Sequence, residues 1–274
     1  MSFSIQGKTA IVTGAANGVG LSIARHFASQ GANVMCADMD EKRLIKEFGE
    51  NPEQDDSKAN GNLRYFAGDL REKLTIANLL SATLDAYDQV DILVNASRQV
   101  LATDPLDCND DSVSVLLEQN VLSGLRLSQL VANRMIAQGE GKDSSERMLG
   151  AIVNLSSIAA TRTLPGLLGF SVASAALDQT TRALAVALAG HKIRVNAVAF
   201  GSLMSASLRD VLSEQPEVRD EIETGTPLGR IASANEVAEA AQYLASECSG
   251  FVTGQVLVVD GGRALVDAVG APFH

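Results

Sequence analysis

Residues 8–20, KTAIVTGAANGVG, are the stretch that decides the expected fold. The run through Thr13 is short, apolar and rich in β-branched residues, which predicts a buried strand. Gly14, Gly18 and Gly20 follow directly, and a helical pattern begins among them. Glycines at such a turn permit a tight bend and a close backbone approach to a diphosphate, which the N–H groups of a helix N-terminus attract. The Gly-x3-Gly-x-Gly spacing is not the general dinucleotide fingerprint, but its place between strand and helix predicts a dinucleotide site.

Short strand patterns alternate with longer helical patterns along the rest of the chain. Most strand patterns are apolar throughout, which is typical of strands covered on both faces. This alternation predicts an α/β class, a Rossmann fold with a doubly wound sheet of seven parallel strands and helices on both faces. The expected strands are 8–13, 33–37, 63–67, 90–95, 151–155, 193–197 and 255–259, and the expected helices are 18–30, 41–48, 75–87, 112–138, 167–189 and 235–246.

No linker rich in Pro, Gly or Ser divides the chain, so we expect a single domain over residues 1–274. Its cofactor half is expected at about 8–150, its active-site and substrate half at about 151–262, and a C-terminal tail at 263–274. The polar, turn-rich segments 49–62 and 139–147 predict surface loops, and a variable lid is expected after Gly201, through residue 225.

Composition limits the classes of function. The net charge of −11 disfavours nucleic-acid binding through a basic face. No signal-peptide pattern opens the chain and no apolar run is long enough to span a membrane, so we expect a cytoplasmic protein without membrane contact. The three scattered cysteines, Cys36, Cys108 and Cys248, show neither a disulfide framework nor metal-ligand spacing, and we expect no metal site.

Asp38 bears on the choice of cofactor. It ends the second expected strand, where a carboxylate can accept hydrogen bonds from both ribose hydroxyls of an adenosine and would repel a 2′-phosphate. Neither Asn17 nor Met39 is a basic residue that would bind that phosphate. The residues therefore favour NAD(H) over NADP(H), although Asp38 could instead be an ordinary turn or cap residue.

These features, in this order, resemble the short-chain dehydrogenase/reductase family from Lys8 to Gly262. The resemblance rests on the glycine turn at 13–20, Asp69-Leu70, Asn95, Asn120-Val121, the NLSS run at 154–157, the IRVNAV run at 193–198, and the segments 227–230 and 259–262. It implies an oxidoreductase that acts on an alcohol or carbonyl substrate. The cofactor-binding residues that we expect are Gly14, Asn17, Gly18, Val19, Gly20, Asp38, Met39, Asp69, Leu70, Asn95, Gly201 and Leu203.

The resemblance also implies four catalytic positions, and this chain departs from the family at two of them. In the family a Tyr protonates the substrate oxygen, a Lys four residues later lowers the pKa of that Tyr, a Ser binds the oxygen, and an Asn positions a water. Ser157 and Asn120 match the last two. Phe170 and Ser174 stand where the Tyr and the Lys belong, and neither can replace them chemically. Loss of a general acid or base commonly costs about 10²- to 10⁴-fold in rate.

Other departures cluster in the same region. The family's NNAG becomes NASR at 95–98, and its Pro-Gly after the sixth strand becomes Phe200-Gly201. Arg98 and Arg162 could bind an acidic substrate or polarise a carbonyl, but a surface or interface salt bridge is the commoner role for such residues. None of the chain's tyrosines, Tyr65, Tyr87 and Tyr243, is placed to substitute for the missing one.

Two hypotheses therefore stand side by side. The chain is an NAD(H)-dependent oxidoreductase with weak or altered proton transfer, or it is a catalytically inactive NAD(H)-binding protein that serves as a sensor or as the non-catalytic subunit of a hetero-oligomer with an active paralogue. The helix expected at 167–189 is apolar on most sides, as in a helix that is buried all round. Together with the resemblance, this predicts a homotetramer or homodimer, or a hetero-oligomer.

Overall fold

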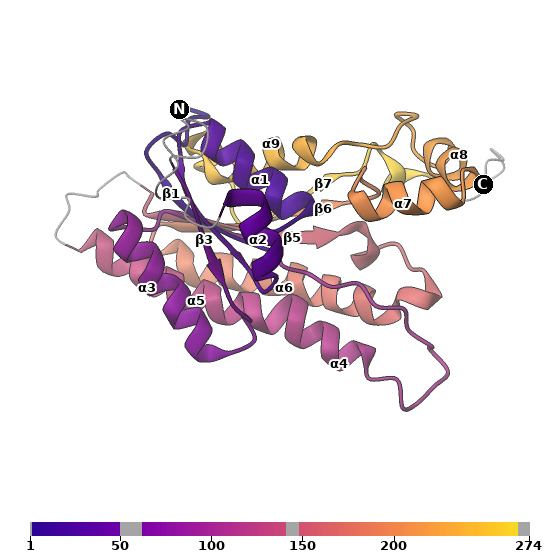
Figure 1. Ribbon diagram of the computed structural model, residues 1–274, viewed down its shortest axis with the longest axis horizontal. Helices are drawn as coiled ribbons and strands as arrows, with labels where there is room; N and C mark the ends of the chain where they lie inside the picture. The colour runs from indigo at the N-terminus through magenta and orange to yellow at the C-terminus, as the bar shows by residue number, and fades with distance from the viewer. Residues whose placement is uncertain (1, 50–61, 141–147, 268–274) are drawn as a thin grey trace.

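Seven parallel strands form one sheet at the centre of the computed structural model, which describes residues 2–49, 62–140 and 148–267 (Figure 1). The strand order is β3-β2-β1-β4-β5-β6-β7, which confirms the predicted doubly wound sheet. The strands are β1 (Thr9–Thr13), β2 (Asn33–Asp38), β3 (Leu63–Ala67), β4 (Ile92–Asn95), β5 (Gly150–Ser157), β6 (Ile193–Phe200) and β7 (Val256–Val259).

Helices cover both faces of the sheet, in two layers (Figure 1). One apolar cluster joins the sheet to α1, α2 and α9, and a second joins its other face to α3, α5 and α6. Burial on both faces is why β1, β4 and β6 are apolar along their length rather than alternating. The helices are α1 (Gly18–Ser29), α2 (Glu41–Phe48), α3 (Lys73–Tyr87), α4 (Ser112–Leu117), α5 (Ser123–Gly139), α6 (Leu168–Ala189), α7 (Ala206–Glu214), α8 (Glu217–Thr224) and α9 (Ala234–Ala245).

One expected helix differs from its sequence-based expectation. The single helix expected at 112–138 is divided into α4 and α5 by a π-helical turn, η2 (Glu118–Leu122), which contains Asn120. A π turn keeps the backbone helical, so the apolar periodicity did not reveal it. The segment expected as a variable lid contains α7 and α8. Most of the two expected surface loops, residues 50–61 and 141–147, and the end of the expected tail, 268–274, lie outside the described residues.

The strand order places a crevice beside β1. From β1 the chain builds outward through β2 and β3 on one side, and through β4 to β7 on the other. The loops after β1 and β4 therefore leave the sheet toward opposite faces, and ligands of such sheets bind between them, at the carboxyl ends of the strands. Among the residues described, no helix combines the length and apolarity that crossing a membrane requires.

Candidate functional site

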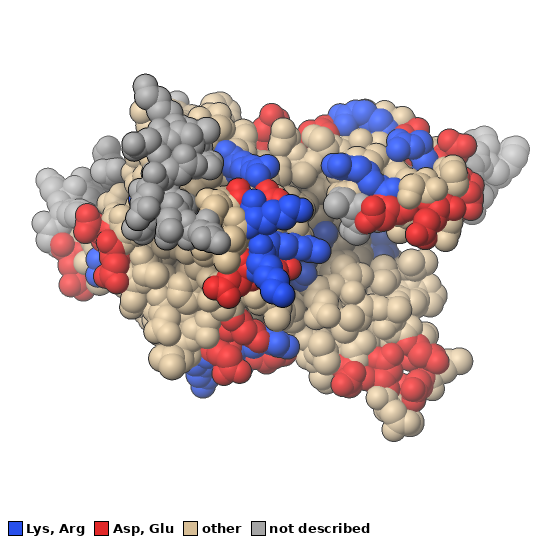
Figure 2. All heavy atoms as spheres, in the orientation of Figure 1, with Lys and Arg blue, Asp and Glu red and all other residues tan. Residues whose placement is uncertain are grey.

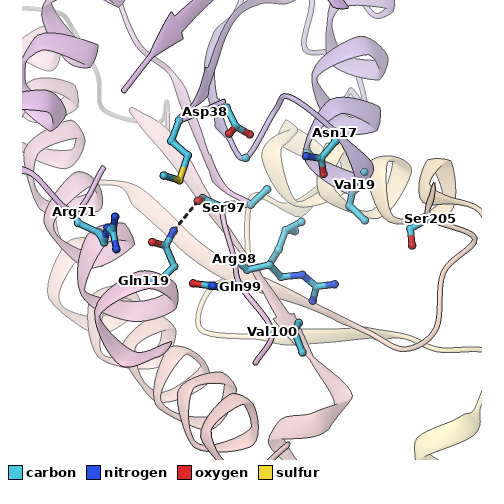
Figure 3. Close-up of a pocket in the computed structure, with 16 residues that line it drawn as sticks. Asn17, Val19, Asp38, Arg71, Ser97, Arg98, Gln99, Val100, Gln119 and Ser205 are labelled. Carbon is cyan, nitrogen blue, oxygen red and sulfur yellow. Dashed lines mark hydrogen bonds between the residues drawn. The ribbon is translucent and has the colours of Figure 1, made fainter. Parts of the chain in front are cut away.

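A cavity of about 600 Å³ opens at the carboxyl ends of β1, β2 and β4 (Figure 3). Figure 2 shows the face of the molecule seen in Figure 1, on which Lys and Arg side chains gather over the region of α2 despite the net charge of −11. Residues from both halves of the chain line the cavity: Gly14, Asn17, Gly18, Val19, Gly20, Asp38, Met39, Arg71, Ala96, Ser97, Arg98, Gln99, Val100, Gln119, Leu155 and Ser205.

The glycine turn forms one wall of the cavity and leaves a helix N-terminus open. A Cβ on Gly14 would lie 2.8 Å from the carbonyl oxygen of Ala96, so only glycine permits this contact between β1 and the loop after β4. Gly18 has a φ of +57°, and nothing lies within 4 Å of the position that its Cβ would take. Asn17 is the N-cap residue of α1, but its side chain makes no capping hydrogen bond to the helix. The first N–H groups of α1 therefore remain available to an anion, and the turn fits a diphosphate.

Asp38 lies at the end of β2 and is held in place by the backbone. Its Oδ2 accepts a hydrogen bond from the N–H of Ala16 at 3.0 Å, and its Oδ1 accepts one from the N–H of Asp40 at 3.0 Å. The side chain of Met39 beside it is 62% exposed. The carboxylate thus presents a negative charge to the cavity near the glycine turn, where the sequence places the adenosine ribose (Figure 3).

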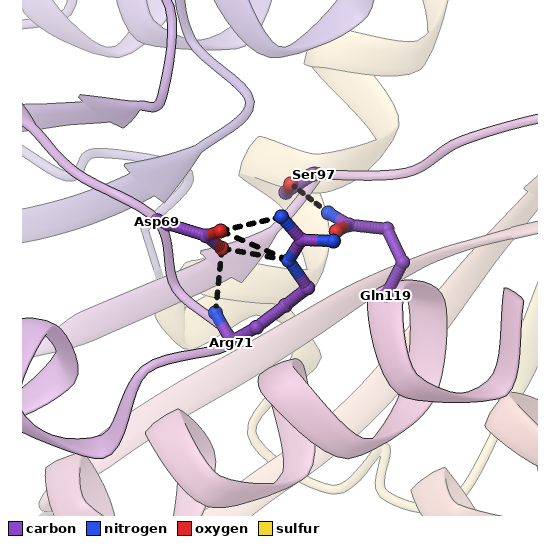
Figure 4. Close-up of polar contacts among 4 residues, drawn as sticks. All are labelled: Asp69, Arg71, Ser97 and Gln119. Atoms are coloured by element: carbon purple, nitrogen blue, oxygen red, sulfur yellow. Dashed lines mark hydrogen bonds and ion pairs between the residues drawn. The ribbon is translucent and has the colours of Figure 1, made fainter. Parts of the chain in front are cut away.

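Arg71, which the sequence analysis did not single out, lies on the wall opposite the glycine turn and is already paired with a carboxylate (Figure 4). Its Nη2 donates to Asp69 Oδ2 at 2.5 Å, and its Nε lies within hydrogen-bond distance of both oxygens of that carboxylate. Hydrogen bonding to the guanidinium lowers the pKa of Asp69, and the same contact raises the pKa of Arg71. The expected site residue Leu70, by contrast, is buried in the core beneath this loop.

The loop that follows β4 is pinned on both sides of Arg98. The N–H groups of Ala96 and Ser97 both donate to Thr13 Oγ1, at 3.0 Å each. Asn120 then makes two hydrogen bonds to the backbone of Gln99, since its Nδ2 donates to the carbonyl oxygen and its Oδ1 accepts from the N–H, each at 2.8 Å. In this structure Asn120 therefore holds a loop, and its amide is committed to that contact.

Arg98 occupies the middle of the pinned loop. Its guanidinium lies 4.2 Å from the ring centroid of Phe200 and 5.8 Å from that of Phe170, as in cation–π contacts. The residue as a whole is exposed and borders the cavity, while the two rings cover part of its guanidinium. This desolvation lowers the pKa of Arg98 to about 10. Neither Arg98 nor Arg162 forms a salt bridge with another described residue of this chain, and Arg162 donates to the carbonyl oxygen of Ala264.

The expected catalytic positions lie beside the cavity rather than on its wall. Ser157 ends β5, is 7% exposed, and accepts a hydrogen bond from the N–H of Ala159 at 3.1 Å. Phe170 is 6% exposed and packs in an apolar cluster with Leu116 and its neighbours. The hydroxyl of Ser174 donates to the carbonyl oxygen of Phe170 at 2.8 Å, one helical turn back along α6.

Three other expected cofactor residues support the site from within the protein. The Nδ2 of Asn95 donates to Ser128 at 2.9 Å and to Asn154 at 2.8 Å, in a buried polar network below the cavity. Gly201 follows β6 and faces Ile158 and Asp260, whereas Leu203 is buried in the core. None of the three is among the described residues that line the cavity.

Sequence reasoning located the glycine turn and the strand-end carboxylate, and it missed several wall residues. One signal was available, because most of these residues directly follow the carboxyl ends of β3 and β4, where ligands of such sheets bind. Gln119 carried a weaker signal as the neighbour of Asn120, and it donates to Ser97 Oγ at 3.2 Å (Figure 4). The missed residues are Arg71, Gln99, Val100 and Gln119.

Comparisons with known proteins agree with this architecture. The family model described as enoyl-(acyl carrier protein) reductase matches residues 14–264. The chain is 33% identical over 268 residues to the 3-oxoacyl-[acyl-carrier-protein] reductase FabG of Chlamydia trachomatis, covering 96% of this chain and 100% of that protein. It is 30% identical over 261 residues to the A-factor type gamma-butyrolactone 1′-reductase (1S-forming) of Streptomyces virginiae, covering 94% and 96%.

Solved structures give the same result. The crystal structure of a putative gluconate dehydrogenase from Agrobacterium tumefaciens superposes with a TM-score of 0.84 at 26% identity, covering 97% of this chain and 99% of that one. The family generally uses nicotinamide cofactors and commonly forms oligomers. The match over nearly the whole length, the strand order and the glycine turn together show that this chain belongs to the short-chain dehydrogenase/reductase family of oxidoreductases.

Proposed function

We propose that the chain binds NAD(H) in the cavity between the glycine turn and the β4 loop, and that its ordinary hydride transfer to or from an alcohol or carbonyl substrate is weak or altered. The observation that carries this proposal is the pairing of two features on one wall: the uncapped N-terminus of α1 and the carboxylate of Asp38. The first suits a diphosphate and the second suits an unphosphorylated adenosine ribose.

The charges around Asp38 favour NAD(H) over NADP(H). A 2′-phosphate would bring further negative charge to a carboxylate whose position is fixed by the N–H groups of Ala16 and Asp40. Of the two arginines among the described wall residues, Arg71 has its guanidinium paired with Asp69, and Arg98 has its guanidinium against the rings of Phe200 and Phe170. Bound in the cavity, the nicotinamide would supply the hydride chemistry of the family. The residues of this chain would orient the nicotinamide and transfer the proton to or from the substrate oxygen.

Proton transfer is the step for which the site is poorly equipped. The described residues that line the cavity include no Tyr, Lys, His or Cys, and their ionisable groups are Asp38, Arg71 and Arg98. We assign Phe170 and Ser174 to the positions of the family's Tyr and Lys, and neither side chain can donate a proton as a phenol beside an ammonium does. Ser157 keeps a hydroxyl near this region, but it already accepts from Ala159.

The remaining tyrosines do not compensate. Tyr65 stacks on Phe48, with ring centroids 6.5 Å apart, and the hydroxyl of Tyr87 donates to the carbonyl oxygen of Asn62 at 3.1 Å. Tyr243 packs against Phe3 at the other end of the sheet. Each of these rings therefore serves packing or local hydrogen bonding, away from the cavity wall.

A second candidate function is an NAD(H)-binding protein without turnover, acting as a sensor or as the non-catalytic subunit of a hetero-oligomer with an active paralogue. The burial of Phe170 in an apolar cluster favours it, because that position now contributes packing in place of chemistry. The catalytic candidate would be cytoplasmic and homotetrameric or homodimeric, whereas the subunit candidate requires a paralogous chain.

One experiment separates the two candidates. The protein is purified from its natural source, its co-purifying chains are identified by mass, and it is titrated with NADH and NADPH and then assayed against a panel of alcohols and carbonyl compounds. Turnover by the homo-oligomer supports the oxidoreductase, and a stoichiometric paralogue with no turnover by this chain alone supports the subunit. Failure to bind NADH, or tighter binding of NADPH, contradicts the proposal.

A further inference from the structure

Arg98 is the unexplained cation of the cavity. Its guanidinium carries five N–H donors, yet none makes a hydrogen bond or an ion pair within the part of the chain that the structure describes. Its contacts are instead the faces of Phe200 and Phe170, at 4.2 and 5.8 Å from the ring centroids. A partly desolvated cation with no anion beside it is costly, and such groups in native proteins are normally paired.

Hydrogen bonds on both sides of Arg98 fix the loop that follows β4. On one side of Arg98, Ser97 is bound to Thr13 through its N–H and to Gln119 through its hydroxyl. On the other side, Gln99 makes two backbone hydrogen bonds to Asn120. The two aromatic faces then limit the rotation of the guanidinium, so little conformational freedom remains to be lost when a ligand binds.

The second arginine of the cavity provides the contrast. Arg71 lies at the other side of the cavity in Figure 3 and is paired with Asp69, since its Nε donates to Oδ1 and its Nη2 donates to Oδ2. No carboxylate of residues 2–49, 62–140 or 148–267 pairs with Arg98 in this way, and Asp38, the acidic residue among the described wall residues, is hydrogen-bonded at the glycine turn. The cavity therefore has one cation that is satisfied by the protein and one that is not.

We propose that Arg98 is an anion-binding residue that recognises an oxyanion of the cavity's ligand, a carboxylate or a phosphate, through the N–H donors along the edge of its guanidinium, whose face lies against Phe200. This inference rests on the proposed function, because it names the class of molecule that the same cavity takes. The oxyanion belongs either to a small acidic substrate or to the nucleotide. A guanidinium suits both, since its fork of donors matches carboxylate and phosphate oxygens.

The test compares wild-type protein with Arg98→Gln, Arg98→Lys and Arg71→Gln. Each is titrated, free of nucleotide, with benzoate, its neutral isostere benzamide and inorganic phosphate, by calorimetry or ligand-observed NMR. We expect Arg98→Gln to weaken benzoate and phosphate by about ten- to a hundredfold, as for lost hydrogen bonds to a charged group, and to leave benzamide within about twofold. Arg98→Lys should recover part of the loss, because it restores charge without the fork. Arg71→Gln removes the same charge from the other side and should preserve the preference for benzoate over benzamide.

A second set of titrations with ADP and NADH identifies the source of the oxyanion. If Arg98→Gln weakens ADP as much as phosphate, the oxyanion is a nucleotide phosphate; if ADP and NADH keep their affinity, it belongs to a small substrate. The inference is overturned if wild-type protein binds benzoate no better than benzamide, or if Arg98→Gln changes both alike. If wild-type protein does not bind NADH but does bind benzoate in a manner that depends on Arg98, the proposed function is overturned and the anion-binding role of Arg98 is supported.

Discussion

Replacement of Asp38 by asparagine tests the proposed cofactor preference, because it removes the charge and keeps the shape. The carboxylate is expected to accept hydrogen bonds from the ribose hydroxyls, and charge-assisted bonds are roughly twice as strong as neutral ones. Loss of the charge should then weaken NADH by about 1.5–3 kcal/mol, or about ten- to a hundredfold in Kd. NADPH should gain about tenfold, since repulsion of its 2′-phosphate is relieved in a partly screened site.

The same substitution has a stability cost that can be worked out from the structure. Asp38 accepts from the N–H groups of Ala16 and Asp40, and an asparagine offers one acceptor oxygen in place of two. One of these N–H groups loses its partner, at about 1 kcal/mol, which lowers the Tm of a chain of this size by about 2–4 °C. Binding and stability are therefore measured separately, by titration at a temperature well below the transition.

The assay is the ratio of the Kd values for NADPH and NADH, obtained by calorimetric titration of wild-type and variant protein. Asp40→Asn is the matched control, because it removes an equal charge two residues away. Asp40 lies outside the cavity wall, where it caps α2 by accepting from the N–H of Arg43 at 3.1 Å. We expect Asp38→Asn to lower the ratio by at least about tenfold and Asp40→Asn to leave it within about twofold. An unchanged ratio in Asp38→Asn, or an equal fall in both variants, would refute the reasoning.

Two further predictions concern the active-site region and the core. Phe170→Tyr with Ser174→Lys should restore measurable hydride transfer on a carbonyl panel, because the variant supplies a phenol and an ammonium one helical turn apart; no activity would contradict the proposal that these two positions limit turnover. On α6, burial raises the pKa of Asp178 and outweighs the opposing effects of the Ser156 hydroxyl and the charge of Arg182. Because its pKa is higher in the folded state, stability falls as pH rises from the unfolded pKa through the folded one, so Asp178→Asn should raise the Tm by a few degrees at pH 7 and less near pH 4. An equal change at both pH values would contradict this assignment.

Local sequence patterns predicted the architecture of the sheet and one wall of the cavity, the wall that the glycine turn and Asp38 form. The apolar strands and the glycine turn predicted the parallel sheet and the place of a diphosphate, because these depend on residues close in sequence. The same reasoning identified Asp38 at the end of β2, where the structure places it on the cavity wall. It also identified Phe170 and Ser174, whose identities can be read without any coordinates.

The environment of each side chain depended on residues far apart in the chain, which no local pattern encodes. Sequence position alone made Asn120 a catalytic candidate, whereas the fold places its amide on the backbone of Gln99, 21 residues away. A surface or interface salt bridge was expected for Arg98, and the tertiary structure places its guanidinium beside the cavity, against the rings of Phe200 and Phe170. The sequence by itself determined the family and the fold, since these follow from residue identity and periodicity, and it supplied the identities of Phe170 and Ser174 on which the proposed loss of acid–base groups rests. Only the tertiary structure decided which cation lacks a partner, because pairing and desolvation arise from contacts between distant segments.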